Sequence, residues 1–138
     1  MRERTELTAA QITERLREAK LRPTAQRVAV CRFVLCHADH PTAEAVKKWA
    51  DANFAKMSLA TVYNTLGSLV KAGLLREFRF PHSESVVYDD NLSEHHHFLD
   101  VRTGAIEDVP ADAVKVRATL GGRYKLHGIQ VVLRGVKS

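Results

Sequence analysis

Three consecutive histidines, His95, His96 and His97, are the residues whose type and spacing most directly suggest chemistry in this sequence. Side chains alternate along an extended strand, so His95 and His97 would share one face while His96 points to the other. Two imidazoles on one face begin a site for a divalent metal such as Fe²⁺, Mn²⁺ or Zn²⁺. The run by itself leaves open a plainer interpretation, in which the three histidines form an exposed polar stretch.

The chain has 138 residues, of which 45% are hydrophobic and 27% are charged. This length is enough for about one ordinary domain or two very small ones, and the composition is that of a folded protein. It excludes a disordered chain, a collagen, a disulfide-rich miniprotein and an enzyme with separate cofactor and substrate lobes. No apolar run could span a bilayer, and the first six residues are too charged to begin a signal peptide. The sequence therefore predicts a cytoplasmic protein without a membrane partner.

The charge is unevenly distributed along the chain. Residues 1–80 contain 14 lysines and arginines against 8 acidic residues, whereas residues 81–138 contain 7 against 8, and five of the seven histidines lie in this second segment. The asymmetry favours a polyanion-binding half joined to a half that could bind a metal, but a solvated basic surface with unrelated histidines fits the composition equally well. Cys31 and Cys36 are expected to be buried thiols and not a disulfide.

Four amphipathic helices are predicted in the first half, and each begins at a hydroxyl residue that can cap it. These caps are Thr8, Thr24, Thr42 and Ser58. The predicted helices span about 8–21, 24–37, 42–54 and 58–72. After Gly73 the pattern changes to short strand-like runs at 74–80 and 86–88, which predict a hairpin around a turn at 81–85. Helices followed by a hairpin form a winged helix-turn-helix, so residues 1–88 are predicted to be a winged-helix DNA-binding domain.

Residues 89–138 are predicted to form a small C-terminal α/β domain, which makes the whole chain α+β. Its expected elements are strands at 97–101 and 105–107, a short helix near 111–120 and an alternating strand at 124–132. A unit of this size buries too little apolar surface to be robust alone, so we expect it to dimerise.

The predicted helix that begins at Ser58 has the features of a DNA-reading helix. Its apolar residues Leu59, Val62 and Leu66 occupy one side, so we expect Thr61, Tyr63, Asn64 and Thr65 to project away from the core. Hydroxyl, amide and aromatic groups of this kind suit base edges and phosphates in a major groove. Lys47, Lys48 and Lys56 add positive charge beside it. The predicted DNA-contacting residues are Arg22, Gln26, Arg27, Ser58, Thr61, Tyr63 and Asn64. The alternative is an ordinary amphipathic helix with a polar outer face.

Several ordered motifs resemble the ferric uptake regulator family. They are Arg22-Pro23-Thr24-Ala25-Gln26-Arg27, His40-Pro41-Thr42-Ala43-Glu44, the run 58–66, Gly73-Leu74-Leu75 and His95-His96-His97-Phe98, and the resemblance extends from about Leu16 to Gly135. It implies a homodimeric, metal-dependent transcription factor, acting as a repressor, with a winged helix followed by a dimerisation domain. A symmetric dimer would match double-stranded palindromic operator DNA.

The resemblance also implies which residues hold metal. The family's sensory site matches His40, Asp89, His95, His97 and Asp108. A possible second metal would fall at Glu94, His96 and His127, but the fourth, acidic position of that site matches Lys115. Many relatives hold a structural zinc with two Cys-x-x-Cys pairs. The first pair matches Asp100 and Thr103 here, and the second is missing, so no structural zinc held by four cysteines is expected.

Two branches of the family share features with this chain. Asp108, in place of glutamate, is similar to the peroxide-sensing branch, in which bound Fe²⁺ reacts with peroxide and a ligand histidine, here His40 or His95, is oxidised. The triple histidine and the run 58–66 are also similar to the iron response regulator branch, which responds to haem, although no Cys-Pro dipeptide is present. We expect a peroxide or iron sensor, with a haem sensor as the alternative. A small metalloenzyme is a further alternative, but no nucleophile motif or phosphate loop accompanies the histidines, so we do not expect an enzyme.

Overall fold

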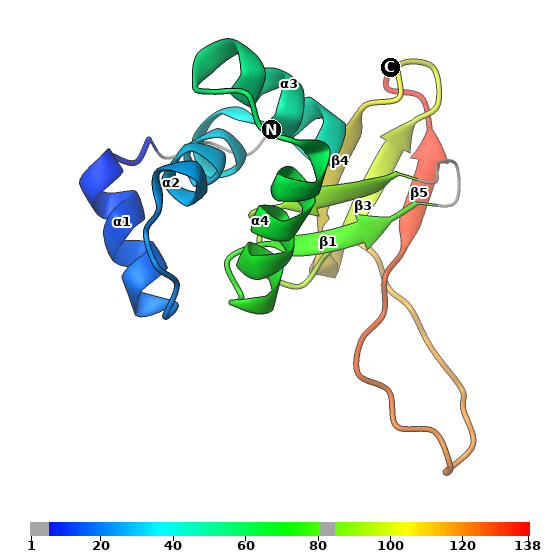
Figure 1. The fold of residues 1–138 in the computed structure, drawn as a ribbon. Coiled ribbons are helices and arrows are strands. Elements are labelled where there is room, and N and C mark those ends of the chain that lie inside the picture. The colour runs from blue at the N-terminus through cyan, green and yellow to red at the C-terminus, as the bar shows by residue number, and fades with distance from the viewer. Residues whose placement is uncertain (1–5, 81–84) are drawn as a thin grey trace. The chain divides into compact units, whose positions relative to one another are not determined.

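A computed structural model describes residues 6–80 and 85–138, and these divide into two compact units (Figure 1). The division falls after Leu92, whereas the sequence suggested a boundary after Tyr88. The first unit therefore includes all of the last strand of the winged helix, with Asp89 at its end. The mixed helix and sheet content confirms the α+β class.

The helices of the first unit begin at the predicted caps. They are α1 (Ala9–Glu18), α2 (Ala25–Arg32), α3 (Ala43–Asn53) and α4 (Leu59–Lys71). The hydroxyl groups of Thr8, Thr24, Thr42 and Ser58 each accept a hydrogen bond from the backbone N–H three residues later. Such caps satisfy donors that the first helical turn leaves unpaired. The second helix continues through a π-helical turn, Phe33–His37, before the chain bends toward α3.

One hydrophobic core holds these helices together. Its most deeply buried members come from every helix, and fully buried side chains include Ile12, Leu16, Val30, Val46, Val62, Leu66 and Leu69. Trp49 of α3 stacks on Phe33 of the π-helical turn, with ring centroids 4.9 Å apart. This packing fixes α4 against the rest of the unit and leaves its other side exposed.

The wing consists of strands β1 (Arg76–Arg79) and β2 (Val86–Asp89), which pair antiparallel with Arg76 opposite Asp89. The predicted hairpin is thus present, while residues 81–84 of its turn lie outside the described residues. The second strand is also tied to the segment before α3. The N–H of Tyr88 donates to the carbonyl of Pro41 at 2.9 Å, and Val87 forms a bridge with Thr42.

The second unit is a three-stranded sheet in the order β4-β3-β5. Its strands are β3 (His95–Asp100), β4 (Ile106–Pro110) and β5 (Val132–Gly135). The central strand β3 pairs antiparallel with β4 and parallel with β5, and the register places His97 opposite Asp108. Among the described residues, no helix has the length and apolar character needed to cross a membrane.

Two predictions for the second unit are wrong. The helix expected near 111–120 is only a 3₁₀ turn, Ala111–Ala113, and the strand expected at 124–132 is instead β5, Val132–Gly135. The intervening segment leaves the sheet as a long loop, drawn in orange in Figure 1. It exposes Val116, Leu120, Tyr124 and Leu126. An apolar pattern specifies a helix or strand only when its apolar face packs on another surface, and these four side chains are not packed in this way in the single chain.

Candidate metal centre and nucleic-acid interface

His40 and Asp89 form a group of candidate metal ligands within the first unit. The Nε2 atom of His40 is 3.3 Å from Oδ2 of Asp89, and both side chains are almost fully buried. The Nδ1 atom of His40 is 2.7 Å from Oδ1 of Asp39. His40 has a φ of 50°, which is uncommon for a residue other than glycine. Backbone conformations of this kind cluster at functional sites, because the surrounding contacts must maintain them.

Local hydrogen bonds explain why these two residues meet. The contacts of Pro41 and Thr42 with β2 hold the segment that follows His40 against the strand that ends at Asp89. The carboxylate of Asp89 is itself oriented, because its Oδ1 accepts a hydrogen bond from the N–H of Asn91 at 2.9 Å. The other oxygen, Oδ2, therefore faces the imidazole.

His95, His97 and Asp108 form a second group in the sheet of the other unit. His95 and His97 share one face of β3, and Asp108 lies on β4 opposite His97. Oδ1 of Asp108 is 3.5 Å from the Nε2 atom of each histidine. The Nδ1 atom of His95 is 2.6 Å from the carbonyl oxygen of Ser93, which requires this nitrogen to be the donor. The Nε2 atom of His95 is therefore the one that can serve as a ligand.

The five predicted ligands thus fall into two groups, one nitrogen and one carboxylate in the first unit and two nitrogens and one carboxylate in the second. Imidazole with carboxylate suits Fe²⁺, Mn²⁺ and Zn²⁺. In both groups, a candidate ligand uses its other nitrogen or oxygen atom in a further hydrogen bond, as is usual in metal sites. These atoms are Nδ1 of His40, Oδ1 of Asp89 and Nδ1 of His95. The donor set therefore fits the metals expected from the sequence.

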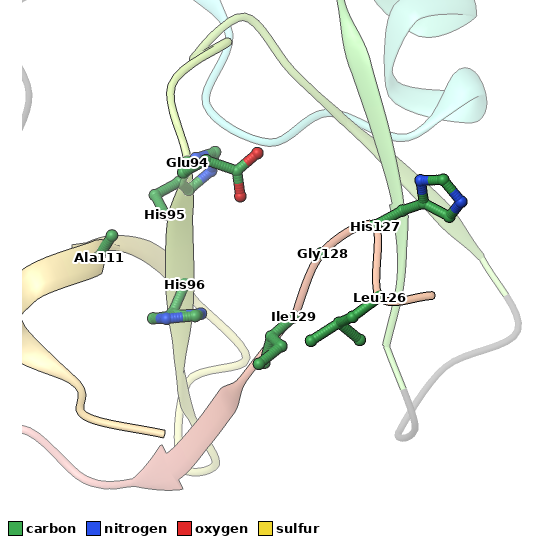
Figure 2. A pocket seen from close by; sticks show the side chains of 8 residues that line it. All are labelled: Glu94, His95, His96, Ala111, Leu126, His127, Gly128 and Ile129. Carbon is green, nitrogen blue, oxygen red and sulfur yellow. The ribbon is translucent and has the colours of Figure 1, made fainter. Parts of the chain in front are cut away.

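The residues suggested for a second metal are not brought together in the same way. Glu94, His96 and His127 all line one pocket of about 410 Å³ in the second unit, but Figure 2 shows that their side chains do not converge on one point. The Nδ1 atom of His96 accepts a hydrogen bond from the N–H of Val131 at 3.1 Å. A neutral imidazole that accepts at Nδ1 carries its proton on Nε2, so this ring offers no lone pair to a metal in this conformation.

The position of the missing zinc cysteine has a different structural use here. Asp100 accepts hydrogen bonds from the backbone N–H groups of Arg102 and Thr103, and so closes the turn between β3 and β4. Burial acts to raise the pKa of Asp100, but these hydrogen bonds outweigh it and lower the pKa. Cys31 and Cys36 are unbridged and buried as predicted. Burial, reinforced by Cys36, raises the pKa of Cys31 to about 12, so this thiol is a poor metal ligand.

Helix α4 presents most of the predicted DNA-contacting face. Tyr63, which is 44% exposed, and Asn64 lie on the outer side of the helix, opposite the buried Val62 and Leu66. Ser58 is exposed, and its hydroxyl caps the helix at Thr61, which is half-buried.

The expectation that Thr65 projects away from the core is wrong. Thr65 is buried, and its hydroxyl donates to the carbonyl of Thr61 at 2.8 Å. It lies three residues after Val62, which places both residues on the same side of the helix.

Tyr63 has a partner that the sequence did not reveal. Its hydroxyl donates to a carboxylate oxygen of Glu44 on α3 at 3.2 Å. Partial burial and the charge of Glu44 raise the pKa of Tyr63. The contact joins two helices across 19 positions, so no local pattern could have predicted it. The contact between Asp39 and His40 was also not predicted. Its only signal in the sequence is that Asp39 directly precedes a predicted metal ligand.

Two of the basic residues expected to contact or attract DNA, Arg27 and Lys47, make hydrogen bonds inside the first unit. The guanidinium of Arg27 donates to the carbonyl of Arg22 at 2.9 Å and so stabilises the bend before α2. Lys47 donates to Asp51 and to the carbonyl of Met57. Four other residues expected to contact or attract DNA are exposed on the surface of the unit, namely Arg22, Gln26, Lys48 and Lys56.

Comparison with known proteins assigns the chain to a family. Residues 18–133 match the model of the ferric uptake regulator family. The chain is 33% identical over 93 residues to the peroxide-responsive repressor PerR of Staphylococcus aureus, and the match covers 67% of this chain but only 62% of that protein.

Solved structures agree with this match. The manganese-containing ferric uptake regulator of Pseudomonas aeruginosa has a TM-score of 0.67 and 25% identity, with 91% of this chain and 97% of that chain covered. The structure of PerR from Streptococcus pyogenes, described as a basis for peroxide sensing, has a TM-score of 0.54 and 27% identity over 99% of this chain and 96% of that one. These are regulators and not enzymes. The chain belongs to the ferric uptake regulator family.

Proposed function

We propose that this chain is a metal-dependent repressor that binds DNA as a homodimer and responds to peroxide or to iron. The observation that carries the proposal is the pair of His/Asp groups. Each group alone has too few ligands for a tightly held ion, and together they supply five. The first group belongs to the unit that contains the winged helix, and the second belongs to the unit expected to dimerise.

One Fe²⁺ or Mn²⁺ ion bound by His40, Asp89, His95, His97 and Asp108 would connect the two units. A metal that binds both groups at once favours the arrangement in which both can reach it. Zn²⁺ is expected in purified protein, because it binds nitrogen and oxygen ligands more tightly than Fe²⁺ or Mn²⁺ do. If the angle between the winged-helix unit and the dimerised unit were restricted in this way, the two copies of α4 in a dimer could match a palindromic operator.

In this proposal, α4 enters the major groove, where Tyr63 and Asn64 read bases. Both side chains lie on the exposed side of the helix. Arg22, Gln26, Arg27, Ser58 and Thr61 would contact the backbone or adjoining bases, and the exposed lysines would attract phosphates.

Peroxide is the signal that we favour. The similarity to two peroxide regulators supports it, whereas none of the similar proteins described above is named for haem. A bound Fe²⁺ would supply peroxide-reducing chemistry here. The imidazole of His40 or His95 would gain one oxygen atom of the peroxide, and the other oxygen would leave as water. A ring oxidised in this way binds metal less well, so the two groups would separate and DNA would be released.

The test is to treat the Fe²⁺ and Mn²⁺ forms with peroxide, and then to measure operator binding by anisotropy and histidine oxidation by peptide mass spectrometry. We expect one added oxygen on His40 or His95 and loss of DNA binding in the Fe²⁺ form, while the Mn²⁺ form resists because it performs this chemistry poorly. If neither histidine is oxidised and DNA remains bound, the peroxide proposal fails. A parallel titration with haem would then decide whether the haem alternative replaces it.

A further inference from the structure

Asp39 makes a contact with the metal-binding part of the first unit that the five proposed ligands do not account for. Its Oδ1 atom lies 2.7 Å from Nδ1 of His40. The Asp39 side chain is 69% exposed, whereas the His40 side chain is only 6% exposed. A carboxylate on the surface is thus hydrogen-bonded to a buried ring whose opposite nitrogen faces Asp89.

This contact fixes the proton arrangement of the ring. An ionised carboxylate can only accept hydrogen bonds, so Nδ1 of His40 must be the donor. In the neutral ring the lone pair then lies on Nε2. That is the atom 3.3 Å from Oδ2 of Asp89, where a cation would find a nitrogen and an oxygen together. The alternative tautomer would place a proton on Nε2 and block that position.

His95 shows that the acceptor differs between the two groups. Its Nδ1 donates to the carbonyl of Ser93, a neutral acceptor, whereas that of His40 donates to a charged one. Hydrogen bonds with an ionised partner are roughly twice as strong as those between neutral groups. A carboxylate behind a ligand imidazole also makes the ring more basic and so strengthens its bond to a metal.

The backbone gives a second reason for an orienting contact at this position. His40 has a positive φ and directly follows the bend at Asp39. A backbone conformation of this kind persists only where surrounding contacts maintain it, and the hydrogen bond between His40 and Asp39 is one such contact.

We infer that Asp39 is a positioning residue, which holds His40 in the Nδ1-protonated tautomer and thereby raises the affinity of the site for a divalent metal. The inference rests on the metal site proposed above. Asp39 is not one of the five proposed ligands, and in this inference it acts through the ring of His40.

The test uses Zn²⁺ as the probe, with its affinity for the full chain measured by competition with a chromophoric chelator. Asp39→Ala removes the acceptor, and Asp39→Asn removes the charge but keeps a carbonyl acceptor. Glu18→Ala is the matched control, because it removes one exposed carboxylate from α1, outside both ligand groups. His40→Ala reports whether His40 is a ligand at all.

We expect Asp39→Ala to weaken Zn²⁺ binding roughly 10- to 100-fold, as is typical when such an orienting partner is lost. Asp39→Asn should lie between wild type and Asp39→Ala, and Glu18→Ala should match wild type. The weakening should persist at high salt, which would abolish a simple attraction between the metal and a surface charge. Nitrogen NMR of the Zn²⁺ form should show His40 protonated at Nδ1 in wild type, with loss or broadening of that signal in Asp39→Ala.

The outcomes separate this inference from the proposed function. If His40→Ala loses Zn²⁺ while Asp39→Ala binds as wild type does, the role of Asp39 is overturned and the metal site stands. If Asp39→Ala and Glu18→Ala weaken binding equally, only net charge matters, and the inference is again overturned. If His40→Ala binds as wild type does, the proposed ligand set is wrong and the inference falls with it.

Discussion

The two units of this chain differ in how completely each one buries its own apolar residues. In the first unit, Ile12, Leu66 and Leu69 are fully buried with many neighbours from four helices. In the second, Leu120 and Leu126 are each 54% exposed on the long loop between β4 and β5. The first unit can therefore be stable with contacts from its own chain alone. The second leaves apolar surface of the kind that a partner chain would cover.

The two groups of candidate ligands differ in the same way as the units that carry them. His95 and His97 share a face because a strand alternates, and the register then places Asp108 beside them. His40 and Asp89 meet only because an irregular segment with a positive φ is hydrogen-bonded to β2. The shared face of His95 and His97 follows from local strand geometry. The contact between His40 and Asp89 depends instead on the tertiary structure of the first unit.

The first prediction tests the difference in packing between the two units. Leu66→Ala should lower the free energy of unfolding of the first unit by about 2–5 kcal/mol, because it leaves a cavity in a fully buried site. Leu120→Ala should change the same quantity by less than about 0.5 kcal/mol, because its side chain is half exposed in the other unit. Trp49, the single tryptophan, reports the first unit during denaturant unfolding. Equal losses in the two variants would contradict the comparison.

The features that could be predicted from the sequence are those that depend on local interactions and not on tertiary packing. The caps Thr8, Thr24, Thr42 and Ser58 located all four helices because capping is a local interaction between residues three positions apart. The hairpin was likewise local. The helix near 111–120 was wrong because an apolar pattern does not specify its partner surface. The pattern would form structure only where such a surface exists.

For the site, local geometry placed His95 and His97 on one face, and the family resemblance supplied the full set of five candidate ligands. Contacts that depend on tertiary packing were missed or misjudged. The Tyr63–Glu44 hydrogen bond joins two helices, and the inward position of Thr65 depends on where α4 meets the core. Neither is encoded by a short motif.

The second prediction is that only the first unit recognises the base sequence of the DNA. Tyr63→Ala should weaken binding to the preferred operator by about 1–3 kcal/mol, with a smaller loss on random DNA, because a lost base contact affects only the specific complex. Lys125→Ala, which removes an exposed positive charge from the second unit, is the control and should leave operator preference unchanged. Anisotropy titrations at one fixed salt concentration measure both. A reading role for Tyr63 is excluded if its loss is equal on operator and random DNA.

The third prediction concerns what covers the second unit. Leu120→Ser should weaken the proposed dimer by about 1 kcal/mol, because roughly half of this side chain remains to be buried on association. Sedimentation equilibrium of exhaustively chelated protein provides the measurement. Wild type should still dimerise under these conditions. The reason is that Asp100 occupies the position of a zinc cysteine and stabilises the turn after β3 without a metal. A monomeric chelated wild type would show that the unit needs a metal to associate.

The fourth prediction concerns two exposed ion pairs, one in each unit. The pKa of one partner is shifted in each pair, and the two affected groups, Asp51 and Lys137, titrate at opposite ends of the pH scale. In the first unit, the hydrogen bond from Lys47, followed by that from the N–H of Met57, lowers the pKa of Asp51. In the second, Glu107 raises the pKa of Lys137, from which it is separated by 2.6 Å. Exposed pairs contribute little, so the direction with pH is more informative than the size.

The sign follows from which charged form the folded state favours. A lowered carboxyl pKa stabilises the fold above the ordinary aspartate value of about 3.9, and this contribution is lost as the pH falls through the lowered pKa. A raised lysine pKa stabilises the fold below the ordinary value of about 10.4, and this is lost as the pH rises through the raised pKa. The difference between wild type and Asp51→Asn should therefore shrink as the solution becomes acidic, and that between wild type and Lys137→Met should shrink as it becomes alkaline. Urea unfolding across the pH range measures both. A Lys137→Met difference that stays constant into strong alkali would mean that the Glu107 contact does not form in solution.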